Sequence, residues 1–181
     1  AFLTGMLHMI EHNQVYPLSG NDVHISYLPL AHVLERIVQV SVIYLGGSIG
    51  FYQGDTLKLM EDMAVLKPTI FASVPRLYNK IYDKILGGVK AAGGLKAYLF
   101  NYAYQSKKYW LQRGFVKHTV WDKIVFGAVR ERLGGRVAFM VTGAAPIAPE
   151  VLDFLRICFS VKLTEGYGQT EGSGGSCATH C

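Results

Sequence analysis

Apolar and polar positions along the chain fall into alternating blocks. Short apolar runs, typical of buried strands, are followed by longer stretches in which apolar residues recur every three or four positions, as in helices. The predicted strands are residues 23–28, 48–52, 69–73, 136–141 and 161–164. The predicted helices are residues 34–45, 56–66, 75–86, 95–112, 118–133 and 150–159. This alternation predicts an α/β fold with a largely parallel sheet flanked by helices.

Glycine, proline and aspartate mark most of the expected boundaries. Gly46-Gly47 is expected to end the first helix, Asp55 to cap the second, and Pro75 to begin the third. Glycine pairs at 87–88 and 93–94 are expected to divide the helical stretch that follows.

The last strand–helix–strand unit carries the most information about a binding site. A strand ending near Val141 is followed by the turn TGAAPIAP, a helix, and a second strand ending at Thr164. Parallel strands joined by a crossover helix end at the same edge of a sheet, where open α/β sheets bind ligands. We therefore expect residues 142–145 and 165–168 to form two loops that face one crevice.

The residue types of these two segments suit a nucleotide. Gly143, Ala144 and Ala145 offer a surface without bulky side chains, on which a flat ring can lie. The ring of Tyr167 can stack on such a ring, and the hydroxyl of Thr170 can contact phosphate oxygens. Glu171 offers the carboxylate oxygen that Mg²⁺ prefers. Spacing alone leaves open that these glycine-rich residues form an ordinary surface loop.

Positive charge is concentrated in the middle of the chain. Residues 77–136 contain twelve Lys or Arg and three Asp or Glu, whereas the whole chain has a formal net charge of only +5. The same segment contains many aromatic residues. Such a segment is typical of a surface that faces nucleic acid, an anionic membrane or a phosphate-bearing substrate, and Lys107 and Lys108 are the cations we expect at such a surface. The alternative is a solvated basic face with its aromatic residues in the core. No nucleic-acid module signature accompanies the charge.

The three cysteines and the apolar runs exclude some classes. Cys158 lies in a helical pattern and is expected to be a small buried residue. Cys177, His180 and Cys181 lack the fourth ligand and the second CxxC of a typical zinc site. An odd number of cysteines fits a reducing compartment. No apolar run in the sequence is long enough to span a bilayer.

Several motifs together resemble those of the long-chain acyl-CoA synthetases, which belong to the adenylate-forming, AMP-binding enzyme superfamily. The resemblance covers nearly the whole chain in collinear order. The motifs are YLPLAHVLER (27–36), FASVPRLYNKIYDKI (71–85), LGGRVAFMVTGAAPIAPEV (133–151) and YGQTE (167–171).

The resemblance implies a fragment of a large N-terminal adenylation domain. Such an enzyme joins a fatty acid to ATP, giving acyl-AMP and pyrophosphate, and CoA thiol then attacks the adenylate to give acyl-CoA. Its expected setting is the cytoplasm or the cytosolic face of the endoplasmic reticulum, the outer mitochondrial membrane or the peroxisome. The family's phosphate loop is expected upstream of residue 1, and its hinge, ribose-binding aspartate and catalytic lysine downstream of residue 181.

The resemblance also implies roles for particular residues. Gly143, Ala144 and Ala145 would line the adenine pocket, and Glu165, Gly166, Tyr167 and Gly168 would complete it around adenine and ribose. Thr170 would contact the α-phosphate, Glu171 would hold Mg²⁺, and His32 would border the carboxylate end of the acyl site. Taken alone, His32 is equally typical of a helix cap or a core residue.

Two alternatives remain open. The first is another adenylating ligase that acts on a different carboxylic acid, which activity with different acids would reveal. The second is a non-catalytic nucleotide-binding or membrane-surface module that keeps the fold. Loss of activity in the complete protein would favour this second class.

Overall fold

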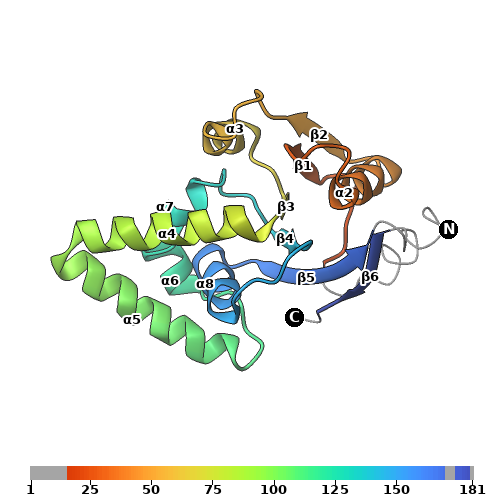
Figure 1. The fold of residues 1–181 in the computed structure, drawn as a ribbon. Coiled ribbons are helices and arrows are strands. Elements are labelled where there is room, and N and C mark those ends of the chain that lie inside the picture. Colours follow the sequence, from red (N-terminus) through yellow and green to blue (C-terminus); the bar gives the residue numbers. More distant parts are fainter. Residues whose placement is uncertain (1–15, 170–173, 180–181) are drawn as a thin grey trace.

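In the computed structural model, which describes residues 16–169 and 174–179, the chain forms one six-stranded sheet in the order β2-β1-β3-β4-β5-β6 (Figure 1). Strands β1 to β5 are parallel and β6 pairs antiparallel with β5. The strands are β1 (Val23–Ser26), β2 (Ser48–Phe51), β3 (Ile70–Ser73), β4 (Phe139–Thr142), β5 (Lys162–Gln169) and β6 (Gly174–Ala178). The α/β fold with a largely parallel sheet is therefore confirmed.

Helices cover both faces of the sheet. They are α2 (Val33–Tyr44), α3 (Leu59–Leu66), α4 (Pro75–Ala92), α5 (Gly94–Leu111), α6 (Thr119–Ile124), α7 (Gly127–Glu131) and α8 (Pro149–Phe159). On one face α2 packs Val38 and Val42 against Ile70, Ala72 and Phe139 of the sheet. The larger core on the other face lies beneath α3, α4 and α8, and α5 packs against α4 and α8.

Several predicted boundaries differ from the structure: strand β4 begins at Phe139 instead of residue 136, strand β5 extends to Gln169, and three helical regions also differ. Helix α4 continues through Gly87-Gly88 and ends only before Gly93, whose φ is 55°. Residues 118–133 form two short helices instead of one. Asp55 accepts a hydrogen bond from the Leu57 N–H but precedes α3, which begins at Leu59.

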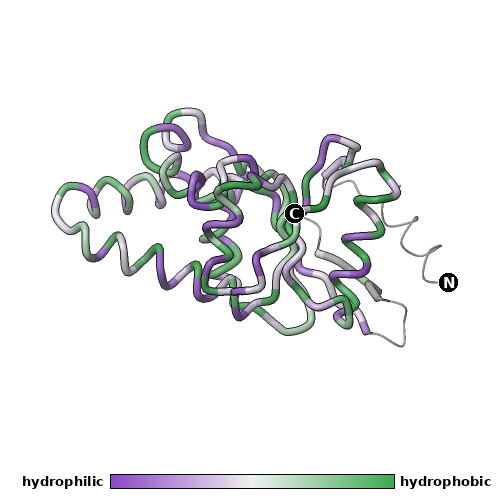
Figure 2. The backbone as a smooth tube through the Cα atoms, turned by 90° about the horizontal axis from the view of Figure 1, so that it is seen from above, coloured by the Kyte–Doolittle hydropathy of each residue, from purple (hydrophilic) through white to green (hydrophobic). Residues whose placement is uncertain are grey.

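Helices α4 and α5 form a long hairpin that extends away from β5 and β6 (Figure 1). Along the helices, apolar and polar residues alternate (Figure 2). None of the helices in the described part of the chain combines the length and apolar character needed to cross a membrane.

Candidate nucleotide-binding site

The two small-residue segments lie side by side at one edge of the sheet. Strands β4 and β5 pair in parallel up to Thr142 and Glu165, which are partners in the register. One residue further on, the backbones are so close that a Cβ atom on Gly143 would lie 2.9 Å from the carbonyl oxygen of Gly166. Only glycine fits at residue 143 without a backbone shift, so the contact between the segments depends on this residue type.

The turn after β4 leaves an open surface of small side chains. Gly143 is buried, whereas Ala144 and Ala145 are exposed. Ala144 has a φ of 72°, in the left-handed region that is unfavourable for residues with a Cβ atom. Ile147, buried in the main core, anchors the end of the turn.

Residues 165–168 do not form a loop, contrary to the sequence prediction. Strand β5 continues to Gln169, and beyond Glu165 it pairs with β6 instead of β4. The Glu165 N–H donates to Thr179 Oγ1 and the Thr179 N–H donates to the Glu165 carbonyl. The segment therefore extends past the carboxyl edge of the parallel strands as an antiparallel ribbon. The glycines of this segment suggested a loop. Its pairing with β6 could not be predicted, because β6 is also glycine-rich and lacks the apolar pattern of a strand.

Tyr167 presents an accessible aromatic ring on this ribbon. Its side chain is 62% exposed, and a register shift lies between Tyr167 and Gly168. Glu165 is half-buried and Gly168 follows in the same strand. Thr170 and Glu171 lie outside the described residues, so their proposed contacts with phosphate and Mg²⁺ stay predictions.

His32 caps helix α2. Its Nδ1 accepts a hydrogen bond from the Leu34 N–H at 3.3 Å, which is the capping role that the sequence left open. His32 follows the carboxyl end of β1, and only β3 separates β1 from β4 in the sheet. The histidine is thus at the same edge as Gly143, and its contact with an acyl carboxylate stays a prediction.

No metal centre is formed by protein side chains in the part of the chain that the structure describes. Among those residues, no group of three or more His, Cys, Asp or Glu is arranged to hold an ion. Cys177 is exposed, and His180 and Cys181 lie outside the described residues. Cys158 is buried, as expected, and burial raises the pKa of its thiol, so that it stays protonated at neutral pH.

A layer of buried hydroxyl groups beneath the edge was not predicted. Tyr27 Oη and Ser73 Oγ are 2.7 Å apart, and burial raises the pKa of Tyr27 to about 12. In the neighbouring strand, Thr142 Oγ1 is buried and has no hydrogen-bond partner among the described residues. A hydroxyl residue at or just beyond the end of each of β1, β3 and β4 is the sequence signal that would have revealed this layer.

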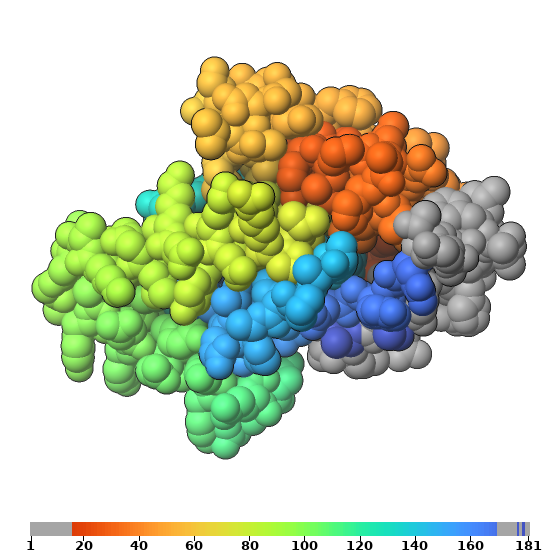
Figure 3. Space-filling view, in the orientation of Figure 1, coloured from red at the N-terminus to blue at the C-terminus, as the bar shows by residue number. Residues whose placement is uncertain are grey.

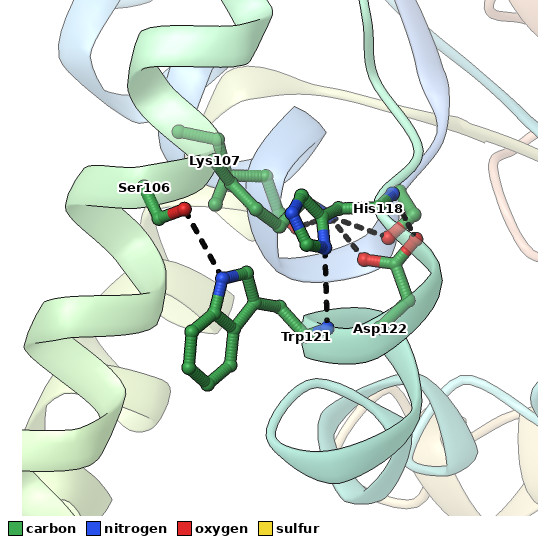
Figure 4. Close-up of polar contacts among 7 residues, drawn as sticks. Ser106, Lys107, His118, Trp121 and Asp122 are labelled. Atoms are coloured by element: carbon green, nitrogen blue, oxygen red, sulfur yellow. Dashed lines mark hydrogen bonds and ion pairs between the residues drawn. The ribbon is translucent and has the colours of Figure 1, made fainter.

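The cations of the basic segment, residues 77–136, are not all exposed. Lys107 is 2% exposed, and its Nζ donates to Asp122 Oδ1, to the Ile157 carbonyl oxygen and to Ser160 Oγ (Figure 4). Asp122 Oδ2 also accepts from the His118 N–H at 2.8 Å. Placing Lys107 at an anionic surface was therefore wrong: it is a buried cation that links α5 and α6 to the end of α8. Lys108, the next residue, is half-exposed.

The carboxyl edge of the parallel strands, with its turn of small residues, is the place where open α/β sheets bind ligands. The chain belongs to the AMP-binding enzyme family, whose sequence model matches residues 1–181.

The chain is similar to curated long-chain acyl-CoA synthetases. It is 55% identical over 154 residues to the peroxisomal long chain acyl-CoA synthetase 6 of Arabidopsis thaliana, covering 85% of this chain and 22% of that protein. It is 46% identical over 160 residues to long-chain-fatty-acid–CoA ligase 1 of Homo sapiens, covering 88% and 23%. The chain therefore spans between a fifth and a quarter of the length of these relatives.

Solved adenylation domains share the fold. The adenylation domain of a carboxylate reductase from Mycobacterium chelonae superimposes with a TM-score of 0.71 at 19% identity, covering 98% of this chain and 24% of that chain. The corresponding domain from Segniliparus rugosus, solved with AMP and a co-purified carboxylic acid, has a TM-score of 0.61 at 26% identity and covers 93% and 24%.

Proposed function

We propose that this chain is the part of a long-chain-fatty-acid–CoA ligase that forms the adenine wall and the metal ligand of its adenylation site. The complete protein joins a long-chain fatty acid to ATP, releases pyrophosphate, and transfers the acyl group to CoA with release of AMP. The close approach of Gly143 to Gly166 beside an exposed Tyr167 carries the proposal. The identity to long-chain acyl-CoA synthetases supports the substrate class.

The small-residue turn and the ribbon divide the binding of the nucleotide between them. Gly143, Ala144 and Ala145 form a flat surface for adenine, and Tyr167 stacks on the base with its exposed ring. Glu165, Gly166 and Gly168 continue the wall toward the ribose. The absence of bulky side chains allows the base to approach the backbone, where N–H and C=O groups can recognise its edge.

Thr170 and Glu171 follow the ribbon and act on the phosphates. Thr170 contacts the α-phosphate, and Glu171 is a ligand of Mg²⁺. A single carboxylate fits this metal, which usually completes its shell with substrate phosphates and water. When bound, Mg²⁺ offsets the charge that develops on the phosphate as the carboxylate attacks. Thr170 would orient the phosphate by a hydrogen bond.

His32 lies at the acyl end of the same edge. Because its Nδ1 accepts from the Leu34 N–H, the neutral ring carries its proton on Nε2, which can donate to the fatty-acid carboxylate. The cap also fixes the ring relative to α2. His32 would therefore orient the attacking oxygen.

The other parts of the site belong to a longer protein. A phosphate loop before residue 1 and a C-terminal domain after residue 181 would complete the site, so this chain alone is expected to be inactive. The partners are a long-chain fatty acid, ATP and CoA, at the cytosolic face of an intracellular membrane or in the cytoplasm. The excess charge of residues 77–136 would attract an anionic partner, either CoA phosphates or membrane lipid.

Fatty-acid-dependent exchange of pyrophosphate into ATP tests the proposal in the full-length protein. Exchange and acyl-CoA formation are expected with long-chain acids, and much slower exchange with short and aromatic acids. Faster exchange with a short or aromatic acid would identify a different adenylating ligase. Nucleotide binding without exchange for any acid would identify a non-catalytic module.

A further inference from the structure

Helix α5 has a second apolar face that the described residues cover only in part, through the edge contact between the Trp121 ring and Tyr102. One face packs inward through Phe100, Ala103 and Lys107. A second face carries Leu95, Tyr98, Leu99, Tyr102 and Tyr109, which recur with helical spacing. The exposed fractions of Leu95 and Tyr98 are 80% and 69%, and those of Tyr102 and Tyr109 are 59% and 52%. A helix that is apolar on more than its buried face is expected to have a second contact.

Aromatic residues continue this face beyond the end of the helix. The Trp110 ring makes edge contacts with both Tyr109 and Phe115. The guanidinium group of Arg113 lies 3.4 Å from the centre of the Tyr109 ring. We call Leu95, Tyr98, Leu99, Tyr102, Tyr109, Trp110 and Phe115 the outer face of α5. It therefore combines exposed aromatic rings with a cation stacked on one of them.

The charges around the outer face have a single sign. Residues 84–121 contain seven Lys or Arg and no Asp or Glu. Of these cations, Lys107 is buried in an ion pair, whereas Lys90, Lys96 and Lys108 form no ion pair with any described residue. Of the other cations of this segment, Lys84, Lys90 and Lys96 are exposed and Lys108 is half-exposed on the helical hairpin, whereas Arg113 and Lys117 follow the hairpin in the chain.

The hairpin is placed where a flat surface can reach it. Helices α4 and α5 extend from the body on the side away from β5 and β6 (Figures 1 and 3). Leu95 and Tyr98 lie on the first turns of α5, next to the hairpin turn at Gly93-Gly94. These two side chains therefore lie at the hairpin end of the outer face.

We infer that the outer face of α5 is a membrane-binding surface that docks on an anionic lipid bilayer. Leucine, tyrosine and tryptophan are suited to the boundary between headgroups and acyl chains, and flanking lysines are attracted to anionic headgroups. A protein partner would be expected to meet some anions on this surface, yet none occurs in 84–121. The inference rests on the proposed function in one respect, because a bilayer is where a long-chain acid substrate is dissolved.

Sedimentation of the full-length protein with vesicles tests the inference. The vesicles are phosphatidylcholine alone, or phosphatidylcholine mixed with phosphatidylserine. The wild type is expected to bind the mixed vesicles more tightly, and less so as salt rises. The charge variant Lys96→Glu/Lys108→Glu should weaken this binding at least about 25-fold, from about fivefold per lysine removed. Its control, Lys58→Glu/Lys162→Glu, makes the same charge change elsewhere and should bind nearly as the wild type does.

Apolar variants test the depth of contact separately from charge. Leu95→Gln/Tyr98→Gln should weaken binding about tenfold or more, because both side chains would leave the headgroup boundary. The control Leu57→Gln/Val65→Gln removes two side chains that are 85% and 86% exposed near α3, and should bind normally. Unchanged binding in both α5 variants would overturn the inference.

Two further measurements separate the remaining outcomes. If the rest of the polypeptide covered the outer face, Leu95→Gln/Tyr98→Gln would lower Tm in the absence of vesicles. If a second copy covered it, the same variant would lower the oligomeric state. Either result would also overturn the inference. Pyrophosphate exchange with an acid presented in detergent should be equal in the wild type and the α5 variants. Absence of exchange in the wild type would contradict the proposed function and leave the vesicle result intact as a test of the surface.

Discussion

The edge of the sheet and the helical layer formed by α4 to α7 differ in what determines their structure. At the edge, the path of the backbone determines the shape of the site: strand order brings Gly143 against Gly166, and small residues keep the surface open. In the helical layer, side-chain burial determines the role of each residue: Lys107 is in the core, whereas Lys108 beside it is half-exposed. A short motif therefore locates the first region well, whereas net charge says little about which cation of the second region meets solvent.

The largest expected effect is at the edge, on Glu171. In the full-length enzyme, Glu171→Gln should raise the barrier to adenylate formation by about 4 kcal/mol, because a charged ligand of the metal is lost. Pyrophosphate exchange measures the effect at saturating Mg²⁺. The control Glu150→Gln changes an exposed carboxylate at the start of α8 and should exchange normally. Equal rates in the two variants would remove Glu171 from the mechanism and weaken the contrast between the regions.

In the helical layer the largest effect should come from Lys107. Lys107→Met leaves Asp122 and the Ile157 carbonyl without their shared donor, and should lower the free energy of unfolding by about 3 kcal/mol. Lys108→Met is the matched control and should change it by less than about 0.5 kcal/mol. Chemical denaturation of the full-length protein measures both. Similar values for the two variants would show that the buried cation has no special role.

The same ion pair predicts a pH dependence. Burial alone would raise the pKa of Asp122, but hydrogen bonds from Lys107 and the His118 N–H hold it below its usual value. Because the folded pKa is the lower one, this stabilisation is present at neutral pH and is lost as pH falls below about 4. The difference in unfolding free energy between the wild type and Asp122→Asn should therefore shrink on acidification. A difference that grew at low pH would contradict this assignment.

Glycine substitutions should have opposite signs in the two regions. Gly143→Ala places a Cβ atom 2.9 Å from the Gly166 carbonyl oxygen and should destabilise the protein by about 2 kcal/mol. Gly87→Ala, on an exposed position of α4 with nothing within 4 Å of the new Cβ, should stabilise it by about 0.5–1 kcal/mol. Thermal unfolding of the full-length protein measures both. Stabilisation by Gly143→Ala would show that the fold does not depend on the close approach of Gly143 to the Gly166 carbonyl oxygen.

The sequence predicted the five parallel strands because each is a short apolar run bounded by turn residues. It failed where tertiary contacts outweigh local preference. Helix α4 continues through Gly87-Gly88 because Leu86 and Val89, on either side of the pair, pack against the main core. The extension of β5 depends on a partner strand that has no apolar pattern of its own.

Buried polar pairs also could not be predicted. His24 and Glu35 are both fully buried, with Nε2 and Oε1 3.0 Å apart. In sequence they look like ordinary solvated residues, since nothing local shows that a strand and a helix bring them together. At the candidate site, the motifs predicted which residues share an edge, whereas the hydroxyl layer of Tyr27 and Ser73 emerged only from the packing of neighbouring strands.

The smallest expected effect distinguishes stacking from hydrogen bonding at Tyr167. Tyr167→Ala should raise the KM for ATP about fivefold, or about 1 kcal/mol, because the exposed ring would no longer cover the base. Tyr167→Phe keeps the ring and should change KM by less than about twofold. Steady-state kinetics of the full-length enzyme at saturating fatty acid and CoA measures both. If the Phe variant were as impaired as the Ala variant, the hydroxyl would carry the interaction, and side-chain polarity as well as backbone shape would determine binding at the edge of the sheet.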